Sequence, residues 1–194
     1  MKRIIIILTI FFVTTGVKLQ GQDSVMKARH KWGFDLGYGT QANLNVNYFH
    51  EVFLLQYQYY FTLTGKEKWA LEFLAQPQFN ISRFKLSAES RSITNGYEYG
   101  LNGGFIFRGY LINDAFSPYI LISAGPHFVS GVPDRQSPGF IFSDNFFTGL
   151  SIRLNENIYL DLRFGFRHIS NAGIQNPNGG INNWVGNTGI IMGF

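Results

Sequence analysis

Large apolar side chains alternate with small or polar ones along most of this chain. The stretch WGFDLGYG, residues 32–39, places only Trp, Phe, Leu and Tyr on one parity, and only Gly and Asp on the other. The same alternation runs through LQYQYYFTL (55–63), YEYGLNGGFIF (97–107), FFTGLSIRL (146–154) and IYLDLRFGF (158–166). A period of two residues is the period of a β-strand whose two faces meet different surroundings. The chain is therefore predicted to be all-β.

Eight strands can be counted. The remaining three are WALEF (69–73), SPYILISAGPHFV (117–129), which alternates least clearly, and the terminal WVGNTGIIMGF (184–194). Clusters of turn-forming residues separate the strands, as in TGKEK, INDAFSP, SGVPDRQSPG and LNEN. Eight strands in a chain of one domain's length predict an eight-stranded antiparallel up-and-down β-barrel.

Two kinds of barrel share this pattern, and the polar face favours one of them. In a soluble barrel the apolar face points inward, whereas in a membrane barrel it points to lipid. The polar parity mixes glycine with isolated charges: Asp35, Glu72, Glu98, Asp161, Arg163 and Arg167. A narrow lumen has room for small residues and a few paired charges, but not for aromatic rings. The chain also ends in IIMGF, and a terminal Phe after an alternating strand resembles the recognition signal of outer-membrane barrels. We therefore predict a transmembrane barrel in the bacterial outer membrane.

The N-terminus has the plan of a secretory signal peptide. Lys2 and Arg3 precede an apolar run from Ile4 to Val13, which is short for a membrane span. Residues 1–21 are predicted to be cleaved and residues 22–194 to form the single barrel domain; an N-terminal membrane anchor is the less favoured alternative. The chain has no cysteine, so it carries neither a disulfide nor a lipoprotein anchor.

Most of the positive charge belongs to the signal peptide. The whole chain has 16 basic and 12 acidic residues, but three of the basic residues precede the predicted cleavage site. The mature chain is therefore close to neutral, and no nucleic-acid partner is expected.

The stretch FRHISNAGIQNPNGGIN, residues 166–182, carries the candidate chemistry. His168 and Ser170 close the predicted seventh strand, Asn157 to Ser170, at its extracellular end and at lipid-facing parity. Two residues apart on one strand face, their Cα atoms lie about 6–7 Å apart, so the imidazole can accept the serine proton. Asn182 has outward parity on the eighth strand, roughly Ile181 to Phe194. The plain alternative is a polar strand end followed by an Asn- and Gly-rich turn.

HISNAGIQNPNGGIN resembles the signature of the PagL-type lipid A 3-O-deacylases, also called acyloxyacyl hydrolases. The resemblance implies an eight-stranded outer-membrane serine esterase that removes a 3-hydroxyacyl chain from lipid A of lipopolysaccharide without a cofactor. No spacing of His, Cys or Asp residues indicates a metal site. It implies Ser170 as the nucleophile and His168 as the general base. It assigns Asn171 and Asn178 to the oxyanion hole and Gly173 to a close backbone approach. Whether the barrel is a monomer or a homodimer stays open.

One position departs from the family pattern. The family's acidic residue aligns with Asn182, and an amide can orient a histidine but cannot stabilise an imidazolium as a carboxylate does. Either Asn182 orients His168, or a nearby acid replaces it, or the barrel is catalytically silent and has a structural or adhesive role. Asp144, predicted just before the sixth strand, is the candidate acid; Asp161 has lumen parity and is a poor one.

Overall fold

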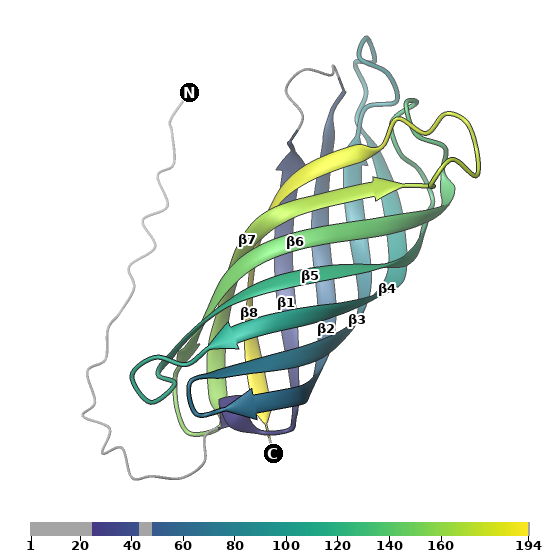
Figure 1. Ribbon diagram of the computed structural model, residues 1–194. Coiled ribbons are helices and arrows are strands. Elements are labelled where there is room, and N and C mark those ends of the chain that lie inside the picture. Colours follow the sequence, from purple (N-terminus) through teal and green to yellow (C-terminus); the bar gives the residue numbers. More distant parts are fainter. Residues whose placement is uncertain (1–24, 43–47, 194) are drawn as a thin grey trace, which may run out of the picture.

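The computed structural model describes residues 25–42 and 48–193, so the signal peptide (1–21) and Phe194 lie outside the described residues. The elements are a short 3-10 helix η1 (Val25–Lys27) and the strands β1 (His30–Gln41), β2 (His50–Lys66), β3 (Trp69–Phe84), β4 (Thr94–Gly109), β5 (Phe116–Val129), β6 (Gly139–Arg153), β7 (Ile158–Ser170) and β8 (Ile181–Gly193). Each strand pairs antiparallel with its neighbours and β8 pairs with β1, which closes the barrel (Figure 1). The predicted fold is confirmed.

The sixth strand begins earlier than the sequence suggested. β6 starts at Gly139, opposite Val129 of β5, and not at Phe146. Its first residues, GFIF, carry apolar side chains on both faces, so the alternation cannot be read there. Asp144, expected just before the strand, therefore lies inside it.

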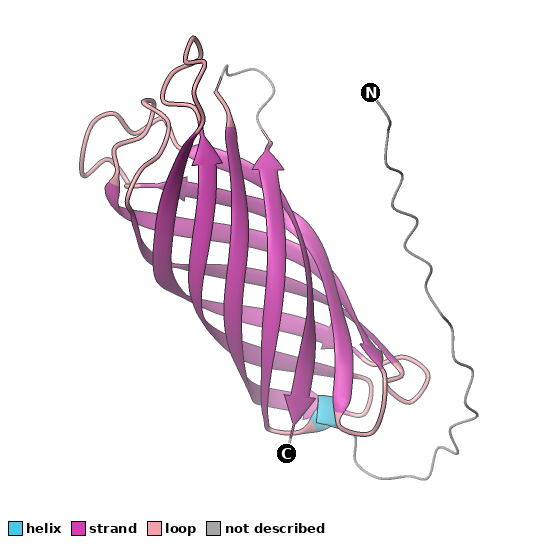
Figure 2. Cartoon of the chain, turned by 180° about the vertical axis from the view of Figure 1, so that it is seen from behind, coloured by secondary structure: helices cyan, strands magenta, loops and turns pink. Residues whose placement is uncertain are grey.

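The two ends of the barrel differ (Figure 2). At one end, where β1 starts and β8 finishes, the connections 67–68, 110–115 and 154–157 are short. At the other end, the connections 42–49, 85–93, 130–138 and 171–180 are each eight or more residues long. Outer-membrane barrels have short periplasmic turns and longer extracellular loops. The end of β7 therefore lies at the extracellular surface.

The outer wall is apolar and rich in aromatic rings. Rings on adjacent strands stack, as Phe164 and Trp184 do with centroids 5.7 Å apart and planes 9° from parallel. Phe105, Phe107 and Phe146 are each more than half exposed, as lipid-facing side chains should be. In the part of the chain that the structure describes, no helix is both long and apolar enough to cross a membrane.

The lumen is filled by buried, paired charges, as predicted. Glu72 accepts from Lys31 at 2.7 Å and from Arg108 at 3.1 Å. The other predicted lumen charges pair as Arg163 with Asp35, Arg163 with Asp161, and Arg167 with Glu98. Because a buried charge without a partner is costly, these pairs require the strand register that brings them together.

The expectation that the lumen excludes aromatic rings is wrong. Buried rings occupy it, among them Tyr60, Tyr119, Phe147 and Tyr159. Lumen-facing glycines make the room, since a Cβ atom at Gly149 would overlap the Tyr119 ring and one at Gly165 would lie 2.7 Å from Phe147. The hydroxyl of Tyr119 donates to Asp161 at 2.6 Å, so its polar end joins the charge network.

Candidate active site at the extracellular rim

His168 and Ser170 lie on the outer wall at the extracellular end of β7. Both are half-buried. Arg167, which precedes the pair, and Ile169, which lies between its members, face inward and are buried. The predicted outward parity of the pair is therefore confirmed. Ser170 lies opposite Phe142 of β6, at the edge of the barrel wall.

Asn182 holds the His168 ring. The two residues are direct partners across β7 and β8, and His168 Nδ1 donates to Asn182 Oδ1 at 2.6 Å. Because an amide oxygen only accepts, Nδ1 carries the proton. The other ring nitrogen, Nε2, is then the unprotonated one and can act as a base. Asn182 therefore lies within hydrogen-bond reach of His168, as a residue that orients the ring must.

The Ser170 hydroxyl has no hydrogen-bond partner among the described residues. Its side chain sits two residues beyond His168 on the same strand face. A serine side chain turns about a single bond, so the hydroxyl can face either the His168 ring or a bound molecule.

The loop after Ser170 is built by its own asparagines. Asn171 is buried, donates from Nδ2 to the Gln175 carbonyl at 2.8 Å and accepts from the Gly173 N–H at 3.0 Å. Asn178 Oδ1 accepts the Asn171 N–H at 3.0 Å, which leaves the Asn178 Nδ2 group exposed at the rim. The Asn171 side chain is thus occupied in shaping the loop, and Asn178 presents an amide donor near the serine.

Gly180 is a site residue that the sequence did not single out. Its φ is 64°, and a Cβ atom at this position would lie 2.5 Å from Cε1 of His168. Only glycine fits both the left-handed backbone and the close approach to the ring. In the sequence, Gly179 and Gly180 look like ordinary turn residues. The contact of Gly180 with His168 depends on the pairing of β7 with β8, which the spacing along the chain does not reveal.

Asp144 flanks His168 on the side away from Asn182. It is the direct partner of His168 across β6 and β7, and it is exposed on the outer wall. Side chains opposite each other in such a pair have Cβ atoms about 4.5–5.5 Å apart. Asp144 forms no ion pair with another described residue, so its carboxylate is available beside the imidazole.

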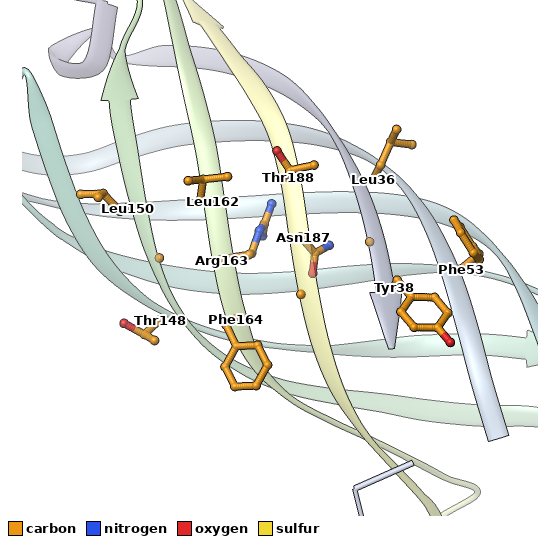
Figure 3. A pocket seen from close by; sticks show the side chains of 13 residues that line it. Leu36, Tyr38, Phe53, Thr148, Leu150, Leu162, Arg163, Phe164, Asn187 and Thr188 are labelled. Atoms are coloured by element: carbon orange, nitrogen blue, oxygen red, sulfur yellow. The ribbon is translucent and has the colours of Figure 1, made fainter. Parts of the chain in front are cut away.

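Figure 3 shows a large hollow on the outer wall, whose lining does not include His168, Ser170 or Asn182. It has a volume of about 740 Å³ and spans β6, β7, β8, β1 and β2, with Leu162, Phe164 and Tyr38 on its sides. Gly186 forms part of it, two outward-facing rows below Asn182, which is about 13 Å along the strand. Of its polar lining groups, Arg163 and Asn187 bind lumen residues, while Thr148 and Thr188 add hydroxyl groups to a largely hydrocarbon surface.

The closed barrel, its aromatic lipid face and its polar rim define an integral protein of the bacterial outer membrane. The family model of the lipid A 3-O-deacylases (PagL) matches residues 14–190, and the chain belongs to that family. The crystal structure of the outer membrane enzyme PagL is 17% identical, with a TM-score of 0.62 over 82% of this chain and 99% of that one. Neisserial surface protein A (NspA) is 14% identical, with a TM-score of 0.55 over 86% and 98%. No curated protein matches the chain by sequence.

Proposed function

We propose that this protein is a serine esterase that removes the 3-O-linked 3-hydroxyacyl chain of lipid A. Membership of the deacylase family supports the substrate. The observation that carries the chemistry is the hydrogen bond from His168 Nδ1 to Asn182, next to a free serine hydroxyl on the lipid-facing side of the rim. Lipid A lies in the outer leaflet, so its ester bonds reach the barrel at this level.

The reaction follows from the protonation of the ring. Ser170 Oγ attacks the ester carbonyl carbon while its proton passes to His168 Nε2. The carbonyl oxygen becomes an oxyanion, and in this proposal the Asn178 Nδ2 group donates a hydrogen bond to it. The carbon–oxygen bond to the sugar then breaks, and the sugar oxygen takes the proton from His168. Water hydrolyses the acyl-serine by the same route and releases the fatty acid.

Asn182 and Asp144 together replace the acidic residue that the family has at the position of Asn182. Asn182 keeps His168 in the tautomer that can accept the serine proton, but it adds no negative charge. Asp144, on the other flank of the ring, supplies a carboxylate that favours the imidazolium formed during attack. Replacing Asp144 with Asn should therefore lower the rate without altering the His168–Asn182 hydrogen bond.

Mass spectrometry of lipid A tests the proposal. Lipid A extracted from cells that produce the protein should lack one 3-hydroxyacyl chain that is present in cells without it. Cells producing Ser170→Ala should retain the chain while the barrel still assembles in the outer membrane. Unchanged lipid A with the wild-type protein would favour the alternative, a catalytically silent barrel with a structural or adhesive role.

A further inference from the structure

Two extracellular loops outside the family motif converge on the His168–Asn182 pair. The connection 42–49 brings Tyr48 to the site, and the connection 130–138 brings Gln136. Both side chains are buried, with exposed fractions of 8% for Tyr48 and 2% for Gln136. Polar side chains buried at a loop-covered rim are held there by specific hydrogen bonds.

Tyr48 forms two hydrogen bonds with the backbone of Asn182. Its hydroxyl accepts the Asn182 N–H at 3.0 Å and donates to the Asn182 carbonyl at 3.3 Å. One phenol oxygen thus engages both polar backbone groups of the residue whose side chain holds the imidazole. The Tyr48 ring is itself covered by the guanidinium of Arg135, 4.8 Å from the ring centroid.

Gln136 binds the residue that packs against a second atom of the ring, Cε1. Its Oε1 accepts the N–H of Gly180 at 3.1 Å, and Gly180 is the residue packed against Cε1 of His168. The surrounding backbone reinforces this contact, because Gly179 N–H donates to the Arg135 carbonyl at 2.7 Å and Ser137 N–H to the Pro177 carbonyl at 2.8 Å. The β5–β6 loop and the β7–β8 loop therefore form one paired unit, visible together at the extracellular end in Figure 1.

We propose that Tyr48 and Gln136 are positioning residues that together clamp the His168 ring, Tyr48 through the contact of Asn182 with Nδ1 and Gln136 through the contact of Gly180 with Cε1. Neither touches the reacting atoms, so each acts on the rate through the orientation of the imidazole. The effect of the clamp on the reaction rate rests on the proposed function, since it acts by keeping the base aligned with Ser170. Its effect on the ring itself does not depend on activity.

Three variants test the clamp in the full-length protein. Tyr48→Phe removes only the hydroxyl, Gln136→Met removes the accepting oxygen at equal length, and Gln136→Glu retains an acceptor. Tyr48→Phe and Gln136→Met should lower kcat about tenfold or more, with KM for lipid A within about twofold, because misplacing a catalytic group costs rate more than binding. Gln136→Glu should recover much of the loss. Tyr110→Phe is the matched control, because that buried hydroxyl donates to the Met26 carbonyl at the periplasmic end.

A second measurement separates the clamp from the reaction. In ¹⁵N-histidine-labelled protein in detergent, the Nδ1–H signal of His168, assigned by its loss in His168→Gln, should shift or broaden in Tyr48→Phe and Gln136→Met but not in Tyr110→Phe. An unchanged signal together with unchanged kcat would overturn the clamp. If the wild-type protein leaves lipid A intact, the proposed function fails, and the His168 signal alone decides whether the clamp exists.

Discussion

Replacing Gly180 with Ala tests whether the packing of the imidazole controls the rate. The new Cβ atom would lie 2.5 Å from Cε1 of His168, whereas carbon atoms pack at about 3.5 Å or more. The ring is the end of a movable side chain, so it should retreat by about 1 Å and leave the backbone in place. A displacement of this size can cost about 100-fold in rate, or about 2.7 kcal/mol in activation free energy.

The same substitution also strains the backbone, so a control is needed. A non-glycine residue at φ 64° costs roughly 1–2 kcal/mol of stability. Gly139 offers the matched variant, because its φ is 100° and an added Cβ atom has no neighbour within 4 Å. Gly139→Ala should show a comparable loss of stability in urea unfolding with detergent, while its deacylation rate should stay within about twofold of the wild type.

The assay is the release of free fatty acid from purified lipid A by detergent-solubilised protein. The expected result is a rate for Gly180→Ala about 100-fold below that for Gly139→Ala at matched folded fractions. Equal rates for the two alanine variants would refute the argument, because the contact with His168 would then have no bearing on the chemistry.

Three further outcomes follow. Ser170→Ala should abolish deacylation and His168→Ala nearly so, and the double variant should lose little more than either single one, because the two act as a unit; full activity in either single variant would exclude the mechanism. Asn182→Ala should slow the fatty-acid release less than Ser170→Ala does, whereas Asn182→Asp should preserve or raise it by adding charge beside Nδ1; a fully active alanine variant would place the third group elsewhere. Glu72→Ala leaves two buried cations unpaired and should lower the free energy of unfolding by about 3–5 kcal/mol. Glu51→Ala breaks a surface ion pair with Arg83, whose side chain is 56% accessible, and should cost about 1 kcal/mol or less; similar losses for Glu72→Ala and Glu51→Ala in urea titrations would contradict the lumen argument.

The sequence by itself determined the barrel and the location of its chemistry. Alternation with a period of two is a local property, and it separated the lipid face from the lumen well enough to place His168 and Ser170 on the outer wall. The same parity placed Asn182 on the outer wall of the next strand, and the resemblance to the deacylase motif set it opposite His168. These inferences need only the pleat of a strand and the order of the strands, which antiparallel hairpins dictate.

Only the tertiary structure decided which groups surround the imidazole. Asp144 lies opposite His168 because of the register between β6 and β7. Gly180, Gln136 and Tyr48 meet there because residues from three separate connections come together at one rim. The rings in the lumen likewise depend on glycines from neighbouring strands, as Tyr119 does on Gly149. Register and loop packing arise from contacts far apart in sequence, and spacing along one chain carries no record of them.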